Sequence, residues 1–494
     1  MLFNSHTFIF LFLPTALVFF YFFKKNNFNA LVWLVICSLF FYGWWKWSYV
    51  FLIIGSIIFN YTFGVLLART IDQQKYAKPI LVIGVALNLG ILAYFKYAYF
   101  ILGHSEGTFA ISFNSSSIVP PLAISFFTFQ QICYLVETAK GEVYEKKFLN
   151  YLLFITFFPQ LIAGPIVHHK EMMPQFHNKK LYPESINYLS LGITIFVLGL
   201  FKKVILADGI SKYADSAFGA VQQGATLSFA EAWSGAISFS FQLYFDFSGY
   251  SDMAIGLALM FGIVLPLNFN SPYKAVNIIE FWRRWHMTLS RFMRDYVYVP
   301  LGGSRKGLPR QGINLMVTML LGGLWHGAGW TFIFWGGIHG LLLVINNLWL
   351  KFRILIGFGC NRSPWWTSWL ARIVTFVILT MTWVIFRADN MASAFDILKS
   401  MAGLNPYIQE GINKIKIGED RLLFYFFIIW FMPNTQQFVA RAHPYWSKSV
   451  KCIHDTWKVF QWQPNHWWAT FIAFLAVLSI LELTKIQEFV YFQF

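Results

Sequence analysis

Long apolar runs without a charged side chain recur along this chain, and short polar segments that carry most of its lysines and arginines separate them. A membrane-crossing helix needs about 20 apolar residues, and several runs reach that length. Strands of a membrane barrel would alternate apolar and polar positions, and these runs do not. We predict an all-α polytopic membrane protein, a helical bundle with roughly 11–13 membrane segments. The uncharged runs cover residues 1–23, 26–45, 47–68, 79–95, 107–136, 148–169, 185–201, 253–273, 311–350, 422–440 and 459–481.

Composition excludes a soluble protein. Only 12% of the 494 residues are charged and 57% are apolar, whereas soluble domains are about a quarter charged. The net charge of +16 is typical of the lysine and arginine excess in cytoplasmic loops, and part of it could serve anionic lipids or an anionic substrate. We therefore expect contacts with membrane lipid and no nucleic-acid partner. The four scattered cysteines predict neither a disulfide framework nor a zinc site: Cys37, Cys133, Cys360 and Cys452.

Basic residues follow the first, third and fifth predicted helices, so we expect these loops in the cytoplasm and the N-terminus outside. Residues 1–23 lack a cleavage site and are expected to stay as the first helix. Residues 148–169 have lysines on both sides, and FPQLIAGPIVHH places two prolines and a glycine at their centre. This pattern predicts a re-entrant piece buried in protein. We expect His168 and His169 to be loop residues, since no further metal ligands have suitable spacing.

Later segments are predicted from the same pattern. Residues 185–201 are expected to form a membrane-spanning helix that ends at Lys202 and Lys203. Two further helices, 229–247 and 253–261, are expected to be joined by DFSGYSD. Within that joint, Asp246 and Asp252 either cap helix ends or line a polar cavity. Further spans are predicted at 369–387, 422–440 and 459–481, with a polar connection at 388–421. Residues 1–494 are expected to form one domain with its core motifs in 148–340.

Residues 281–296 predict one amphipathic helix lying at the membrane interface. Its apolar side includes Trp282, Trp285, Leu289, Phe292, Met293 and Tyr296, and its polar side Arg283, Arg284, Arg291, Arg294 and Asp295. His286 falls on the border between the two sides, where it either packs or functions. The arginines either set topology and touch lipid or hold the phosphates of a nucleotide-containing donor. Trp282, Arg283, Arg291 and Arg294 are the candidates for binding that donor.

His326 lies inside the uncharged run 311–350, which is long enough for two passages or one broken one. An ionisable group at membrane depth predicts a function, because it needs a partner or a wet cavity. Gly322, Gly323, Gly327 and Gly329 surround it, and they permit close helix approach or exposed backbone. An imidazole kept neutral is the usual general base. His339, thirteen residues later, falls on about the opposite helical face and is expected to pack.

Two stretches carry a resemblance: FWRRWHMTLSRFMRDYVYVPLGGSRKG, and NLMVTMLLGGLWHGAGWTFIFWGGIHG after it. Together with PQLIAGPIVHHKEMMPQF, YFDFSGYSDMAIGLALMFGI, LPLNFNSPY and the final YFQF, they resemble the membrane-bound O-acyltransferase (MBOAT) family. The resemblance is to its bacterial branch, which includes the membrane subunit of alginate O-acetylation. It implies a helical core in which a cytoplasmic funnel and an outer cavity meet, with His326 as the catalytic histidine and His286 in support.

The resemblance also implies an activity. We expect an O-acyltransferase of the bacterial inner membrane that moves an acetyl group from acetyl-CoA or an acylated carrier protein to an extracytoplasmic, alginate-like polysaccharide. A periplasmic or membrane-anchored acetyltransferase is the expected partner, with no permanently bound cofactor and no metal. Peptidoglycan O-acetylation and D-alanyl transfer to teichoic acid are alternatives. From the residues alone, a glycan or solute transporter and a non-catalytic scaffold also stay open.

Overall fold

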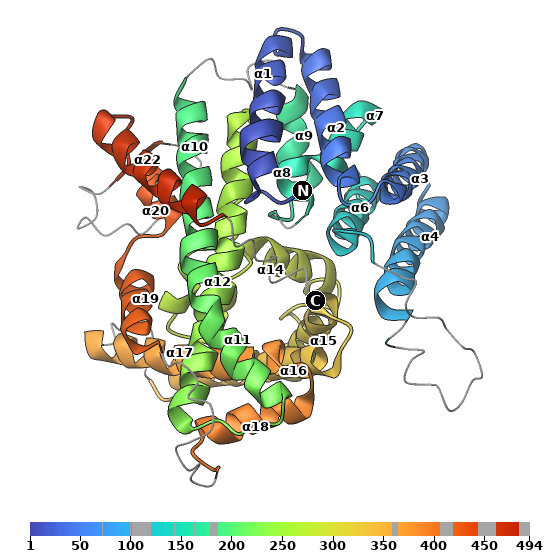
Figure 1. Ribbon diagram of the computed structural model, residues 1–494. Coiled ribbons are helices and arrows are strands. Elements are labelled where there is room, and N and C mark those ends of the chain that lie inside the picture. Colours follow the sequence, from blue (N-terminus) through green and yellow to red (C-terminus); the bar gives the residue numbers. More distant parts are fainter. Residues whose placement is uncertain are drawn as a thin grey trace. The chain divides into compact units, whose positions relative to one another are not determined.

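The computed structural model describes residues 1–71, 73–98, 100, 120–142, 145–162, 164–177, 186–357, 364–405, 418–442 and 461–483. Every regular element in these ranges is a helix (Figure 1), which confirms an all-α protein. Cys360, Cys452 and the final YFQF lie outside the described residues. Five described helices are long and apolar enough to cross a membrane: Ser48–Thr70, Lys75–Tyr97, Tyr188–Gln222, Trp330–Leu355 and Trp365–Arg387. The total of 11–13 segments stays a prediction.

The chain forms two compact units, and each draws on separate parts of the sequence. The first comprises Met1–Leu200, Tyr250–Pro266 and Ile472–Ile486. Within it, the helices α3 (Ser48–Thr70), α4 (Gln74–Leu92) and α6 (Ile124–Ala139) pack on one another (Figure 1). They share a buried polar network, in which the Asn60 amide donates to Asn88 and Gln131 and accepts from Asn88. Its helices before residue 140 are η1 (Thr7–Phe12), α1 (Leu13–Phe23), α2 (Asn27–Gly43), α3 (Ser48–Thr70), α4 (Gln74–Leu92), η2 (Ala93–Tyr97) and α6 (Ile124–Ala139).

The segment predicted to be re-entrant is a broken helix. It consists of α7 (Phe148–Thr156), α8 (Phe158–Leu161) and irregular chain that leads to α9 (His169–His177). Phe157 leaves the helical conformation with ψ 106°, and a proline at the start of α8 cannot donate a backbone hydrogen bond. The described residues of this break are buried. The prediction of a broken, protein-buried piece is thus confirmed, and its course relative to the membrane stays a prediction.

The prediction that a helix ends at Lys202 and Lys203 was wrong. One continuous helix runs through α10 (Ile186–Phe201), η4 (Lys202–Ala207) and α11 (Asp208–Gln222). Lys203 is buried, and its Nζ lies 2.7 Å from a carboxylate oxygen of Asp208 and 2.7 Å from one of Asp246. A buried ammonium is tolerated when carboxylates compensate its charge. The position of Lys203 in the sequence therefore does not indicate the end of the helix.

The prediction of two helices joined by DFSGYSD was also wrong. A single helix, α12 (Phe229–Met260), passes through this stretch. Asp246 and Asp252 are buried in its interior and therefore cap no helix end. Asp246 instead forms the ion pair with Lys203, which supplies the compensation that an isolated carboxylate would lack.

Among the described residues, the second unit comprises those of Phe201–Gly249 and Leu267–Phe471. The predicted span 422–440 was wrong, because α19 ends at Phe431 before Pro433, and Asn434 then caps a new short helix. The unit's further elements are η5 (Pro272–Lys274), α13 (Ile278–Trp282), α14 (Met287–Met293), η6 (Arg294–Tyr298), α15 (Gly307–His326), α16 (Trp330–Leu355), α17 (Trp365–Arg387), α18 (Met391–Met401), α19 (Glu419–Phe431), α20 (Thr435–Phe438) and η7 (Ala440–Ala442). A last apolar helix, α22 (His466–Leu481), follows. The single domain over 1–494 stays a prediction.

Candidate functional site

The amphipathic helix predicted over 281–296 is interrupted, and that prediction was wrong. α13 ends at Trp282, α14 begins at Met287, and His286 between them has φ 41° and ψ 54°. This left-handed conformation is rare for a residue with a side chain and persists only where its surroundings support it. Backbone bonds to a neighbouring segment provide support: Asn270 N donates to Arg284 O, and Met287 N to Asn268 O, both at 2.9 Å.

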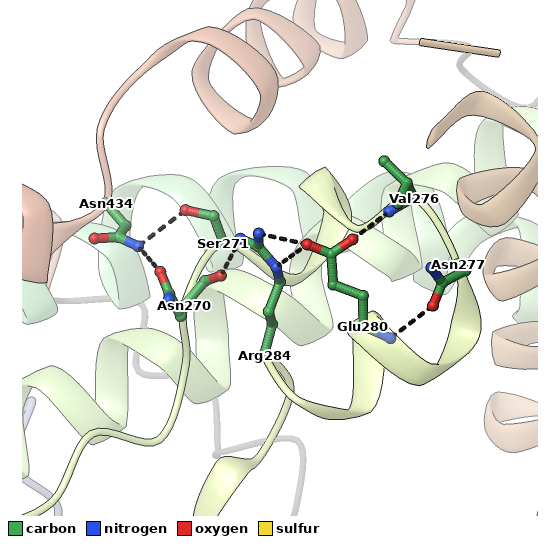
Figure 2. A network of polar contacts seen from close by, with 7 residues as sticks. All are labelled: Asn270, Ser271, Val276, Asn277, Glu280, Arg284 and Asn434. Atoms are coloured by element: carbon green, nitrogen blue, oxygen red, sulfur yellow. Dashed lines mark hydrogen bonds and ion pairs between the residues drawn. The ribbon is translucent and has the colours of Figure 1, made fainter. Parts of the chain in front are cut away.

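A polar network holds the same segment beside α13 (Figure 2). Arg284 donates to Glu280 Oε1 through Nε and Nη2, and to the Asn270 carbonyl through Nη1. Asn434 Nδ2 donates to Asn270 Oδ1 at 3.1 Å and to Ser271 Oγ at 2.9 Å. The bonds between Arg284 and Glu280 are charge-assisted, and such bonds stabilise more than neutral ones. The network therefore fixes residues 268–271, the support on which His286 rests.

His286 is fully buried, not on the border of an apolar face as predicted. Its Nδ1 lies 3.0 Å from Asn268 Oδ1, and its ring stands edge-on to the Phe247 ring with centroids 4.7 Å apart. Burial lowers the pKa of His286 to about 3, because a charged imidazolium loses its hydration there. The imidazole is therefore neutral across the physiological pH range.

His326 is the last residue of α15 and retains 5% exposure. Three aromatic rings surround it, with centroids 4.9 Å (Trp325), 5.2 Å (Trp335) and 5.3 Å (Phe386) from its own. Gly327 then leaves the helix in an extended conformation. The uncharged run 311–350 thus lies in two helices, α15 and α16, and His326 is at the break between them. The choice between two membrane passages and one broken passage stays a prediction.

Glycines bring the two helices of this pair together. A Cβ on Gly323 would overlap the Phe332 carbonyl oxygen, and one on Gly336 would overlap the Met319 carbonyl oxygen. Gly322, by contrast, has nothing within 4 Å of a Cβ. Close approach of α15 and α16 is therefore the role of Gly323, and the prediction of close approach holds for it but not for Gly322.

One tryptophan touches both predicted catalytic histidines. The Trp325 ring centroid lies 5.9 Å from that of His286 and 4.9 Å from that of His326. The two histidines, 40 residues apart in sequence, therefore belong to one buried site. Further aromatic rings pack on both histidines, and a surrounding of low polarity strengthens any electrostatic contact made inside it.

The predicted donor-binding residues are placed in different surroundings. Trp282 donates from its indole Nε1 to His339 Nδ1 at 3.3 Å and stands against the Trp335 ring, so it belongs to the aromatic cluster. Arg283 is exposed. Arg294 is exposed and pairs with Asp295 at 2.7 Å. Arg291 is half-buried on α14. Their role toward a donor stays a prediction.

Other histidines have structural partners. His339 is fully buried, and its Nε2 lies 3.1 Å from Thr382 Oγ1, which agrees with the predicted packing role. In the first unit, His168 Nδ1 lies 3.0 Å from Glu137 Oε1, and both side chains are buried. Across the described ranges, no group of three or more His, Cys, Asp or Glu side chains could hold a metal ion.

Asn268 and Thr382 are contacts of the histidines that the sequence pattern did not single out. Asn268 lies in LPLNFNSPY, a stretch noted only for its resemblance. An uncharged amide within an apolar run carries no local signal of its partner, because its contact with His286 spans 18 residues of chain. Only the fold brings it to the ring.

Comparison with known proteins identifies the family of the chain. The MBOAT, membrane-bound O-acyltransferase family matches residues 137–386. A peptidoglycan O-acetyltransferase from Helicobacter pylori is 44% identical over 82% of this chain and 80% of its own. A probable alginate O-acetylase, AlgI, from Pseudomonas aeruginosa is 38% identical over 84% of this chain and 78% of its own. A teichoic acid D-alanyltransferase from Streptococcus thermophilus is 29% identical over 55% of this chain.

The long apolar helices are those of a multi-pass membrane protein, and the comparisons make it an enzyme that transfers acyl groups to oxygen. The chain belongs to the membrane-bound O-acyltransferase family. The matched residues include both histidines. Relatives named as an O-acetyltransferase and as probable O-acetylases cover most of its length. The chain is therefore a membrane O-acyltransferase. This confirms the predicted family and activity class and rules against a transporter or a scaffold without activity.

Proposed function

We propose that this enzyme takes an acetyl group from a cytoplasmic thioester, acetyl-CoA or an acylated carrier protein, and passes it across the bacterial inner membrane. The acceptor is a hydroxyl that leads to an extracytoplasmic glycan. The observation that carries the proposal is the buried site in which Trp325 contacts both His286 and His326. A site of this kind can hold a thioester and a hydroxyl in reacting geometry, which lowers the barrier by several kcal/mol.

His326 acts as the general base in this proposal. The acceptor oxygen attacks the thioester carbonyl carbon while the imidazole takes the hydroxyl proton. The carbon–sulfur bond then breaks, the ester forms, and the proton passes to the departing thiolate. A positioned base contributes about 10²–10⁴-fold to such a step. His286 orients the reactants beside it, and the four predicted donor residues would receive a nucleotide-containing thioester at the cytoplasmic side.

Two acceptors are supported by the relatives. Alginate-like exopolysaccharide is the predicted acceptor and matches the name of relatives at 34–38% identity. Peptidoglycan matches the name of the Helicobacter pylori relative, whose identity to this chain is higher at 44%. In either case we propose delivery through a periplasmic or membrane-anchored acetyltransferase, with the N-terminus of this chain in the periplasm.

The test replaces the base and follows acetyl. Purified His326→Ala is expected to lose about 10²–10⁴-fold of labelled acetyl transfer from acetyl-CoA. His339→Gln is the matched control, since it alters a buried histidine that bonds Trp282 and Thr382, and it should keep transfer within a few fold. Equal transfer by His326→Ala and wild type would reject the base assignment.

The acceptor needs a separate measurement. Ester-linked acetate is quantified on purified peptidoglycan and on secreted polysaccharide from a deletion strain and its complemented parent. Loss from one polymer alone identifies that polymer as the acceptor. Unchanged acetate on both polymers would refute glycan O-acetylation as proposed here.

A further inference from the structure

The side-chain amide of Asn268 contacts both His286, which precedes α14, and Thr288, which lies in its first turn. Its Oδ1 lies 3.0 Å from His286 Nδ1 and accepts from Thr288 Oγ1 at 2.9 Å and from Thr288 N at 3.4 Å. A backbone N–H can only donate, so the amide atom that faces it is the oxygen and not the nitrogen. The amide orientation is therefore determined by the backbone of Thr288.

This orientation decides where the imidazole proton lies. An amide oxygen has no proton to give, so His286 Nδ1 must carry the hydrogen of that bond. Burial lowers the pKa of His286 to about 3, so the ring carries one proton and not two. Its other nitrogen, Nε2, is buried and has no hydrogen-bond partner among the described residues.

We infer that Asn268 is a positioning residue that holds neutral His286 with its proton on Nδ1 and turns the Nε2 lone pair toward the substrates. The inference rests on the proposed function and narrows it. A lone pair accepts a hydrogen bond from a hydroxyl, thiol or amide N–H, and it cannot donate to a thioester carbonyl. His286 therefore orients a substrate donor group, and polarisation of the carbonyl is the task of another group.

The surroundings of His286 explain why the tautomer depends on one amide. The rings that pack on it, Phe247, Phe269 and Trp325, offer no acceptor for Nδ1–H. Segment 267–271 carries no charged side chain. The segments that pack on His286 also carry ionisable groups, among them Asp246 with its partner Lys203, Asp252, His326, Arg283, Arg291, and Arg284 with its partner Glu280.

Two variants and a matched control test the inference. Asn268→Leu removes the acceptor and is expected to lower kcat on the order of 10²-fold, with a smaller change in KM. Asn268→Asp keeps an acceptor and adds a negative charge, which favours the imidazolium. The pH at which His286 Nε2 gains a proton should therefore rise by about one pH unit or more. Asn270→Asp is the control, because it places the same charge in the same segment, where Oδ1 faces Asn434; its His286 ring should titrate as in wild type.

Nuclear magnetic resonance of the full-length protein with ¹⁵N-labelled histidine reads the tautomer without any activity. The His286 signals are those that disappear in His286→Gln. We expect an unprotonated Nε2, coupled to both ring C–H protons, in wild type and in Asn270→Asp. A proton on Nε2 in wild type at neutral pH, or a His286 titration in Asn268→Asp that superimposes on that of wild type, would overturn the inference. Absence of acetyl transfer by wild type would refute the proposed function and leave the tautomer result standing.

Discussion

Two adjacent glycines on α15 allow a sharp test of how His326 is placed. A methyl group at Gly323 would meet the Phe332 carbonyl oxygen and, at 3.2 Å, the Gly336 Cα. Both are backbone atoms, which cannot rotate away, so α15 and α16 must separate. A methyl group at Gly322 meets nothing within 4 Å. Gly323→Ala and Gly322→Ala therefore differ in the clash alone.

The magnitude follows from that difference. Each alanine gains up to about 1 kcal/mol of helix propensity over glycine, and this gain cancels between the two variants. Overpacking costs about 1–3 kcal/mol, so Gly323→Ala should be less stable than Gly322→Ala by that amount. Since His326 follows three residues later on α15, Gly323→Ala should also lower acetyl transfer.

The measurement compares thermal unfolding of the two purified variants in the same detergent, followed by tryptophan fluorescence, with acetyl transfer assayed on the same samples. Gly322→Ala is expected to match wild type in both. If the two variants unfold at the same temperature and transfer acetyl equally, close approach at Gly323 does not position His326.

Three further outcomes are expected. Lys203→Met leaves the carboxylates of buried Asp246 and partly exposed Asp208 uncompensated and should lower the free energy of unfolding by about 3–5 kcal/mol. Asp246→Asn leaves a one-to-one ion pair and should cost less. Denaturant unfolding measures both variants, and the reverse order would contradict this expectation. Trp282→Phe removes one hydrogen bond to His339 and should cost about 1 kcal/mol, read from its melting temperature. The pKa of His286 is about 3 in the folded protein and about 6.5 in the unfolded chain. Protonation of this ring therefore favours the unfolded chain, and the protein loses stability as pH falls below 6.5. The share of His286 is about 1.4 kcal/mol per pH unit. His286→Gln should flatten the measured slope by that amount, and an unchanged slope would contradict the burial.

The helical class of the protein was predictable because a charge-free run inside a membrane must pair its own backbone N–H and C=O groups, and a helix does so. The break between α15 and α16 was among the alternatives for the same reason: 40 uncharged residues exceed one passage. α12 was missed because Asp246 and Asp252 have the appearance of residues at a helix end. Nothing near Asp246 in sequence identifies Lys203 as its partner, since the ion pair spans 43 residues.

The interruption between α13 and α14 was missed for a different reason. The apolar period over residues 281–296 favours one uninterrupted helix, and local propensity contains no signal against it. The break is imposed by backbone bonds from residues 268 and 270 to residues 287 and 284. Long-range pairing of this kind overrides periodicity, and it also explains why His286, predicted at the border of an interfacial helix, is buried.

Both histidines of the site occur where a helix is interrupted, and the two interruptions differ in a way that favours different roles. His326 terminates the 20-residue α15, and the carbonyl end of a helix favours a positive charge. That end helps a base to hold a proton during transfer. His286 instead precedes α14 in a left-handed conformation, with its ring packed against Phe247, Phe269 and Trp325 and its Nδ1 bonded to an uncharged amide. Nothing there favours a second proton. A pair of titratable groups whose surroundings differ in this way divides base and positioning roles between them, which is why we assign the proton transfer to His326 and the orientation of substrate to His286.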